Sequence, residues 1–431
     1  MKSDSGRTIS IWMGTADVPD FPPLGESLET DVCVVGAGIA GLSTAYMLAQ
    51  EGRKVVVLDD GPIGGGETGR TTAHFVNALD DFYHEIEKVH GREGARIGAE
   101  SHTAAINRVE SIIRSEGIEC HWRRLNGYYF LGGGDTVDVL DRELEAAHRA
   151  GLTDWRRLAR APLTAFDTGP ALEAPNQGQL HILAYLAGLA RAITQRGGRI
   201  FCGTHVTGFE KEPRHKVTTD AGHSVHAKSV VFATNSPVND WVTMHTKQAA
   251  YRTYVVAARV PAGSVEPGLY WDTPDPYHYI RLAYGDARGK DGSDWLIVGG
   301  EDHKTGQQPE DPEERLRCLE EWTRARFRMI EGFDYRWSGQ VMEPADFMGF
   351  MGRNPGDREV YIITGDSGNG MTHSTIGAMI VADLVMGREN PWEKLYSPSR
   401  VNVHPESALE FIKENVNVAG QYAQHATPGQ V

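Results

Sequence analysis

The stretch DVCVVGAGIAGLSTAYMLAQEGRKVVVLDDG, residues 31–61, constrains the fold more than any other part of the chain. It reads as an apolar strand, a glycine turn, a helix and a second apolar strand. Two apolar strands joined by a helix form a parallel βαβ unit, because a parallel pair needs a long crossover connection. The sequence therefore predicts an α/β fold with a doubly wound, Rossmann-like nucleotide-binding domain.

The turn in this stretch has the pattern GxGxxG, with glycines at Gly36, Gly38 and Gly41. Such glycines allow the tight turn, the approach of a pyrophosphate and close helix–strand packing, while the helix N-terminus attracts phosphate. Asp59 ends the second strand and is placed to accept hydrogen bonds from a ribose, with Asp60 as the competing candidate. An acid there disfavours a 2′-phosphate. We expect a dinucleotide ligand. The alternative, a helix that packs closely on the sheet with no ligand, does not explain the acid at Asp59.

The loop GPIGGGETGRTTAHF, residues 61–75, favours FAD over NAD. It stands where an NAD domain would proceed to its next βα unit, and its small residues can press backbone against an extended cofactor. Thr68, Arg70, Thr71 and Thr72 can donate to phosphate or flavin. The alternative is a flexible surface loop, which the same composition allows.

The later chain leaves this pattern and returns to it. Residues 1–29 look irregular, 199–235 reads as three strands with a hairpin turn at 220–222, and 250–306 reads as an aromatic-rich antiparallel set. Residues 359–387 repeat the strand, glycine turn and helix of the N-terminus. We predict an FAD-binding domain interleaved with an antiparallel-sheet (α+β) substrate domain, and a ligand at their boundary. The predicted ranges are 28–95, 175–240 and 341–400 for the FAD-binding domain, 96–174 and 241–340 for the substrate domain, and 401–431 for a C-terminal helix and linker.

Several motifs together resemble one family. They are GAGIAGLSTAYMLAQEG, VVVLDDGPIGGGETGRTTA, VVFATN, LIVGGEDHKTG and YIITGDSGNGMTHSTIGA. The chain resembles the D-amino-acid oxidase superfamily of FAD-dependent oxidoreductases, and GETGRTTAH, YWDTPDPYHYIRL and WSGQVMEP are similar to a bacterial subgroup that carries a C-terminal Rieske iron–sulfur domain.

The resemblance implies which residues hold FAD. It places the adenine end on the first glycine turn and the isoalloxazine end on the last one, where a helix N-terminus would stabilise negative charge on the reduced ring. The implied cofactor residues, besides those named above, are Ile39, Ala40, Ala73, Val206, Ala233, Thr234, Gly365, Gly368, Asn369, Gly370, Met371 and Thr372.

Candidate substrate residues lie on the aromatic strands. Tyr277, Tyr279 and Arg281 alternate, so they share one strand face, where Arg281 could bind a carboxylate bidentately. Ordinary sheet residues would show the same alternation. His303 ends a strand and is a second candidate, although a lone His is more often structural. Arg70 is the best polar candidate over the ring.

Further residues surround these candidates. Trp337 and Gln340 line the site or anchor the domain junction, and His74 is near enough to raise the question of a covalent flavin link. Two departures from the family are also visible. The strand LIVGGEDH has glycines where amine oxidases often carry a lysine that promotes reaction with O2, with Lys304 nearby, and this favours a dehydrogenase. The segment PADFMGFMGR brings Met348 and Met351 towards the pocket.

Residues 411–431 resemble the segment that leads into the subgroup's Rieske domain. A Rieske centre needs C-x-H and C-x-x-H pairs, which this sequence lacks. Either the sequence is part of a longer protein or this protein has lost that electron outlet, and we then expect electrons to pass to O2, a separate carrier or a quinone. The predicted reaction is oxidation of the C–N bond of an amino acid or secondary amine to an imine. The alternatives are a flavin electron-transfer module that works with a separate iron–sulfur partner, and a non-catalytic FAD-binding fold.

Composition excludes other classes of partner. The net charge of −15 argues against a nucleic-acid binder, and the sequence has no apolar run of membrane-span length. The four scattered cysteines form no metal-binding pattern, so no metal is expected, and they favour a reducing, cytoplasmic location.

Overall fold

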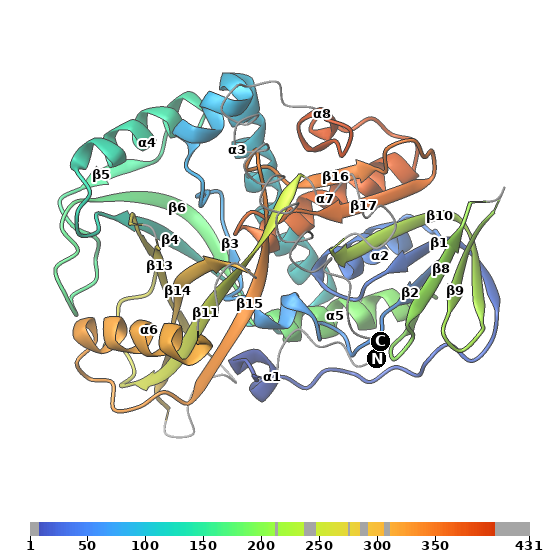
Figure 1. Ribbon diagram of the computed structural model, residues 1–431, viewed down its shortest axis with the longest axis horizontal. Coiled ribbons are helices and arrows are strands. Elements are labelled where there is room, and N and C mark those ends of the chain that lie inside the picture. The colour runs from blue at the N-terminus through green and yellow to red at the C-terminus, as the bar shows by residue number, and fades with distance from the viewer. Residues whose placement is uncertain are drawn as a thin grey trace, which may run out of the picture.

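The protein is described here from a computed structural model, in which two β-sheets form two lobes with helices packed around them (Figure 1). The described residues are 8–211, 214–236, 247–274, 276–284, 292–305 and 311–400. The helix and linker expected over 401–431 lie outside them.

The first sheet is the predicted nucleotide-binding sheet. Its strand order is β16 (Phe350–Arg353), β17 (Val360–Thr364), β10 (Ser224–Asn235), β1 (Leu28–Val35), β2 (Val55–Leu58) and β7 (Arg199–Phe201). All neighbours pair in parallel except β16, which runs antiparallel at one edge. Helices α2 (Ile39–Gln50), α5 (Ile182–Gln195) and α7 (Gly370–Val385) pack with it. The predicted α/β fold class is confirmed.

The hairpin turn predicted at 220–222 joins β9 (His215–Thr219) to β10. β10 is a single strand where two were expected, because its first residues pair with β9 while its residues from Val225 to Phe232 pair in one register with β1. β8 (Val206–Glu210) completes this side of the sheet by pairing with β9.

The second sheet is mainly antiparallel. Its order is β15 (Tyr335–Pro344), β11 (Gln248–Val260), β14 (Asp294–Lys304), β13 (His278–Ala283), β12 (Leu269–Asp272), β4 (Arg123–Phe130), β6 (Ala171–Gln179) and β3 (His74–Phe75), with β5 (Arg156–Leu158) beside β6. Helix α6 (Pro312–Arg326) packs on β11 and β14, and α4 (Val137–Arg149) packs on β6. The long α3 (Tyr83–Glu116), interrupted at Gly91, lies against α4 and α7.

The domain borders taken from the sequence stay predictions. Strand β6 runs through the border at 174, β15 runs through the border at 340, and β3 belongs to the second sheet although it falls within 28–95.

The N-terminal segment is not wholly irregular, so that expectation was wrong. Helix α1 (Ile11–Thr15) starts at the cap Ser10, whose Oγ also donates to the Gly69 carbonyl. Trp12 is 1 % exposed and donates from Nε1 to the Thr71 carbonyl at 2.6 Å. This helix therefore supports the loop that follows the first βαβ unit, in which Glu67–Arg70 form a short 3₁₀ turn.

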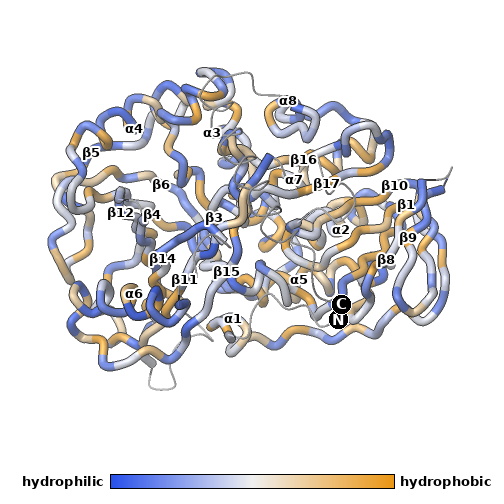
Figure 2. The backbone as a smooth tube through the Cα atoms, viewed as in Figure 1, coloured by the Kyte–Doolittle hydropathy of each residue, from blue (hydrophilic) through white to orange (hydrophobic). Residues whose placement is uncertain are grey.

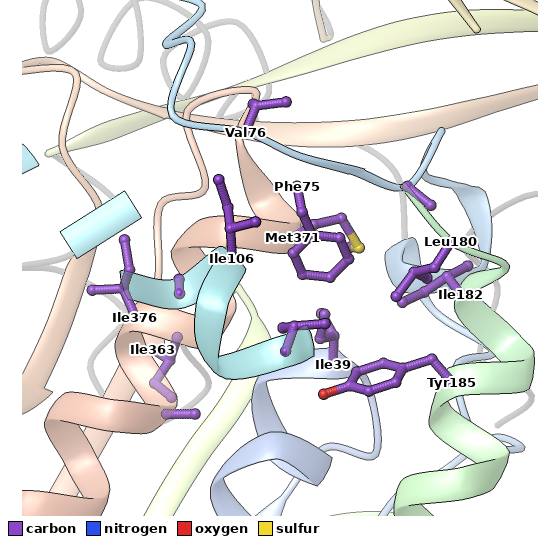
Figure 3. Close-up of a cluster of buried hydrophobic side chains, with 14 of the residues drawn as sticks. Ile39, Phe75, Val76, Ile106, Leu180, Ile182, Tyr185, Ile363, Met371 and Ile376 are labelled. Atoms are coloured by element: carbon purple, nitrogen blue, oxygen red, sulfur yellow. The ribbon is translucent and has the colours of Figure 1, made fainter. Parts of the chain in front are cut away.

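A buried apolar cluster joins the two glycine turns. Ile39 at the start of α2 and Met371 at the start of α7 lie in one core with Phe75, Ile182 and Tyr185 (Figure 3). Apolar residues are also concentrated along the strands and helices of the first sheet (Figure 2). The shared core fixes the helix N-termini relative to one another.

Candidate active site

A cavity of about 480 Å³ extends between the two glycine turns and reaches the second sheet. The predicted residues that line it are Gly36, Gly38, Ile39, Ala40, Asp59, Asp60, Thr68, Arg70, Thr71, Thr72, Val206, Ala233, Thr234, Tyr277, Tyr279, Gly365, Gly368, Asn369, Gly370 and Met371. His74, Gln340 and Met351 line it as well. Residues far apart in the sequence therefore meet in one elongated space. Their individual roles stay predictions.

The first glycine turn is shaped for close approach of backbone to a ligand. Gly36 has φ +109°, and a Cβ there would lie 2.3 Å from the Ala233 carbonyl oxygen. A Cβ on Gly41 would lie 1.8 Å from the Gly36 oxygen, so Gly41 serves helix–strand packing and does not line the cavity. Gly38 faces Thr68, whose Oγ1 accepts from the Ile39 N–H at 3.1 Å. These features fit the pyrophosphate of a dinucleotide.

Asp59 holds the turn from the end of β2. Its carboxylate accepts from the Ala37 N–H at 2.5 Å and from the Gly61 N–H at 2.8 Å. Burial raises the pKa of Asp59 to about 6, against the lowering effect of these two bonds. Because a carboxylate has about four acceptor positions, both oxygens keep capacity for ribose hydroxyls. Asp60 lies 3.6 Å from Nδ1 of His205, which also lines the cavity.

The loop after the βαβ unit is tied to β15. Glu67 accepts from the Gln340 N–H at 2.7 Å, and Trp337 donates from Nε1 to the Arg70 carbonyl at 2.7 Å. Arg70 is 4 % exposed, and its guanidinium donates to the Ser338 carbonyl at 3.3 Å. Trp337 is thus an anchor between lobes, while Gln340 lines the cavity.

The second glycine turn brings the N-terminus of α7 to the cavity. Gly365 and Gly368 have φ +75° and +67°. Asn369 is 4 % exposed, and its Oδ1 has no hydrogen-bond partner among the described residues. An acceptor buried without a partner is costly unless a ligand supplies a donor, so this turn fits the polar edge of a flavin. Thr372 does not line the cavity, and its Oγ1 accepts from the Val76 N–H at 3.0 Å.

An aromatic wall from the second sheet closes the cavity. Tyr277 and Tyr279 have ring centroids 5.7 Å apart, and the Tyr279 hydroxyl lies 2.8 Å from Oγ1 of Thr253. The predicted shared face is therefore present for these two tyrosines. Gly299 makes room for the wall, since a Cβ there would lie 2.1 Å from the Tyr279 ring. Trp271 adds a further ring to the lining.

Arg281 does not line the cavity, so the structure opposes a substrate-carboxylate role. Its buried guanidinium donates to the carbonyls of Thr72 at 2.7 Å and Ala73 at 2.9 Å, and it lies over the Trp12 ring. Burial lowers the pKa of Arg281 to about 9. Alternation along the strand predicted that Arg281 shares a face with the tyrosines. The structure shows instead that backbone carbonyls bind its guanidinium away from the cavity. Ala73, with φ +60°, is held here and lies outside the lining.

His303 also lies outside the cavity, with its ring stacked on Tyr254 at a centroid distance of 5.7 Å. Lys304 is likewise not part of the lining. Met351 lines the cavity, whereas Met348 is fully buried and packs near Gly98 of α3.

Sequence reasoning missed the carboxylates beside the aromatic wall. Asp80 lines the cavity and accepts from the Tyr277 hydroxyl at 3.2 Å, and burial raises its pKa to about 7. Asp366 accepts from the Met342 N–H at 2.8 Å, and burial raises its pKa to about 6. Asp80 stands in the irregular segment before α3, where no periodicity marks it. The pair Asp80-Asp81 after an apolar run was the available signal.

Metal-binding clusters and membrane-spanning helices are two further features that bear on function, and both concern the described part of the chain. No group of three or more His, Cys, Asp or Glu residues there could hold a metal ion. None of the helices described there combines the length and apolar character needed to cross a membrane.

Comparison with known proteins agrees with this geometry. The family model for DAO, "FAD dependent oxidoreductase", matches residues 31–384. YhfW of Bacillus subtilis (strain 168), named for a Rieske 2Fe-2S centre, is 30 % identical over 95 % of this chain and 79 % of its own length. Gamma-glutamylputrescine oxidoreductase of Escherichia coli (strain K12) is 29 % identical over 88 % of this chain and 89 % of its own.

Solved structures share the fold. Glycine oxidase from Geobacillus kaustophilus superposes with a TM-score of 0.70 at 18 % identity, over 86 % of this chain and 99 % of that one. With a family model that spans most of the chain and a cavity that fits the cofactor, FAD is the cofactor, and the chain belongs to the DAO family of FAD-dependent oxidoreductases.

Proposed function

We propose that this chain oxidises the C–N bond of an amino acid or secondary amine to an imine, which water then hydrolyses. The observation that carries the proposal is the single cavity that joins a dinucleotide turn to an aromatic wall at the other glycine turn. Relatives named gamma-glutamylputrescine oxidoreductase and glycine oxidase, the latter from Bacillus licheniformis at 23 % identity, support an amine or amino acid as substrate.

FAD, when bound, supplies an acceptor for the hydride of the carbon that bears the nitrogen. The protein residues bind, orient and exclude water. Tyr277, Tyr279 and Trp271 wall the substrate end, and the buried Tyr279–Thr253 pair keeps that wall rigid. Arg70 is held at the cavity by β15 and by the loop, so its charge has a fixed position.

We propose a dehydrogenase in preference to an oxidase. The strand LIVGGEDH has glycine where amine oxidases of the family often carry a lysine. Gly299 is needed there because the Tyr279 ring fills the space of a side chain. Electrons would pass to a separate carrier or, less readily, to O2. We also propose a cytoplasmic location, which the four free cysteines support.

The test is anaerobic addition of single amines to the purified yellow protein. Glycine, sarcosine, D- and L-amino acids, putrescine and gamma-glutamylputrescine form the panel. Loss of the visible band of oxidised flavin with at least one amine is the expected result. Bleaching by dithionite but by no amine would refute the amine-oxidising function.

A second candidate is a flavin electron-transfer module that serves a separate iron–sulfur partner. The observation in its favour is the 30 % identity to the Rieske-named YhfW. The variant Arg70→Ala separates the two functions. An amine oxidoreductase should lose amine-driven bleaching, whereas an electron carrier should keep its reduction by chemical donors.

A further inference from the structure

Asp80 lies where two cavities meet. Besides the cofactor cavity, it lines a second cavity of about 440 Å³ on the side of the second sheet. Trp271 and Tyr277 line both cavities as well. Asp80 and the two rings therefore form a wall shared by the place expected for the flavin ring and a separate space of substrate size.

Two elements hold the Asp80 carboxylate at this shared wall. The Tyr277 hydroxyl donates to its Oδ2 at 3.2 Å. On the other side stands Gly368, in the turn before α7, where a Cβ would lie 1.9 Å from the same oxygen. The glycine at this position is thus what allows the carboxylate to lie against the turn that the family uses at the ring.

The charged groups around Asp80 make a cation the suitable ligand. Asp302 and Asp366 both act to raise the pKa of Asp80, adding to the larger effect of burial, while the Tyr277 hydroxyl lowers it. Asp81, Asp302 and Glu343 also line the second cavity. Lys247 lines it too, but its Nζ donates to the carbonyls of Pro398 and Arg400.

An independent observation points to a ligand with N–H donors at the same place. Asn369 follows Gly368 directly, lines the cofactor cavity and is 4 % exposed. Its Nδ2 donates to the Ser367 carbonyl at 3.1 Å, while its Oδ1 has no partner among the described residues. A ligand N–H beside Asp80 would supply the missing donor.

We propose that Asp80 binds the substrate ammonium and accepts one of its protons, so that the amine presents a free lone pair; this rests on the amine-oxidising function proposed above. In this step one N–H bond of R–NH₃⁺ breaks and one O–H bond forms on the carboxylate. The electron pair stays on nitrogen, giving R–NH₂ and a neutral carboxyl group, and nothing is oxidised. Burial raises the pKa of Asp80 to about 7. Desolvation lowers the pKa of the bound ammonium against the opposing effect of the nearby carboxylates and rings, so the two pKa values approach one another and the transfer becomes feasible.

The first test measures binding without turnover. Tetramethylammonium is a fixed cation with no N–H, and its binding to the holoprotein is followed by the change in flavin absorption. Wild type should bind it about tenfold more tightly at pH 8 than at pH 6, because Asp80 ionises in that range. Asp80→Asn should bind at least tenfold more weakly at pH 8 and lose the pH dependence. Equal binding by Asp80→Asn and wild type would overturn the proposal.

A matched control removes the same charge outside both cavities. Asp135 is exposed and accepts from the hydroxyl of Thr273, a residue of the second cavity, so Asp135→Asn tests general electrostatics near the site. It should keep the wild-type affinity and pH dependence. If Asp80→Asn does not retain FAD, Tyr277→Phe replaces it. Loss of the hydroxyl that lowers the Asp80 pKa should move the pH midpoint for tetramethylammonium upward, and an unmoved midpoint would overturn the proposal.

The second test addresses the proton transfer with an amine that bleaches the flavin. In wild type the rate of anaerobic bleaching should rise with pH through about 7. In Asp80→Asn the rise should move up by two pH units or more, towards the pKa of the free amine, and the rate should recover at high pH. An unchanged profile would overturn Asp80 as proton acceptor and leave the amine-oxidising function intact. If no amine bleaches the flavin, that function fails, while the tetramethylammonium titration still decides whether Asp80 binds cations.

Discussion

The contact between Gly41 and Gly36 gives a quantitative test of the first glycine turn. A methyl group at position 41 would lie 1.8 Å from a backbone oxygen, and neither group is the end of a flexible side chain. The start of α2 would therefore have to move by more than an ångström. Overpacking of this kind costs about 3 kcal/mol or more, while alanine gains about 1 kcal/mol in helix propensity over glycine. The net expectation for Gly41→Ala is a loss of about 2 kcal/mol.

Two assays follow from this shift. For a chain of this length, 2 kcal/mol corresponds to a fall of roughly 2 °C in the thermal midpoint of the apoprotein. The displaced N–H groups should also raise the FAD dissociation constant at least tenfold, or about 1.4 kcal/mol. Calorimetry gives the first value, and quenching of FAD fluorescence on binding to the apoprotein gives the second.

Gly98→Ala is the matched control. Gly98 is also buried within a helix, but a Cβ there would meet only the Cε of Met348, at 3.1 Å. A methionine side chain can move aside, so the midpoint should stay the same or rise, with unchanged FAD affinity. If Gly41→Ala behaves like Gly98→Ala in both assays, the reasoning from a rigid backbone contact is wrong.

Three further predictions can be checked with simple measurements. Asp59→Ala removes the acceptor of two backbone N–H groups. The loss of hydrogen bonds to a charged group costs about 2 kcal/mol of stability at this turn, so the variant should have a lower FAD content when purified. Asp346 forms an ion pair with Arg400 at 2.7 Å. Burial acts to raise the pKa of Asp346, but the charge and hydrogen bonds of Arg400 outweigh this effect, and the pKa lies below its ordinary value of 3.8. The ionised Asp346 therefore stabilises the fold above pH 3.8, and this stability is lost as the pH falls below that value. Asp346→Asn should therefore flatten the acid limb of a pH–stability curve, and an unaltered limb would contradict the ion pair. In a native thiol titration only Cys318 should react quickly, because it is exposed and the other three cysteines are buried; more than one fast thiol would contradict the packing.

The strand–turn–helix units were predictable because glycine spacing, apolar strands and helical periodicity are local signals. Both glycine turns, with the helices that follow them, are found where the sequence places them. Helix α1 was missed because five residues are too few to show helical periodicity. Strand β10 was divided in two because pairing with β9 and with β1 is a property of the sheet, which the sequence of one strand does not display.

The positions of site residues were predictable where the backbone conformation of a glycine turn or strand sets them. They were less predictable where a side chain has several possible hydrogen-bond partners. Alternation predicted the shared face of Tyr277 and Tyr279, yet it also included Arg281, which binds carbonyls of the cofactor loop instead. Asp80 went unnoticed for the converse reason. Its position depends on a cavity formed by segments almost three hundred residues apart, from Asp80 to Asn369.

The strand order of the first sheet also bears on how the protein can be synthesised. β1 emerges first from the ribosome, but its neighbour β10 and the strand beyond it, β17, are made much later. A nascent chain that ends before β17 therefore exposes one edge of β10 and the apolar face that α7 covers. Such a chain is exposed to aggregation until β17 and α7 have been made, and FAD can stabilise the fold only after both elements are in place.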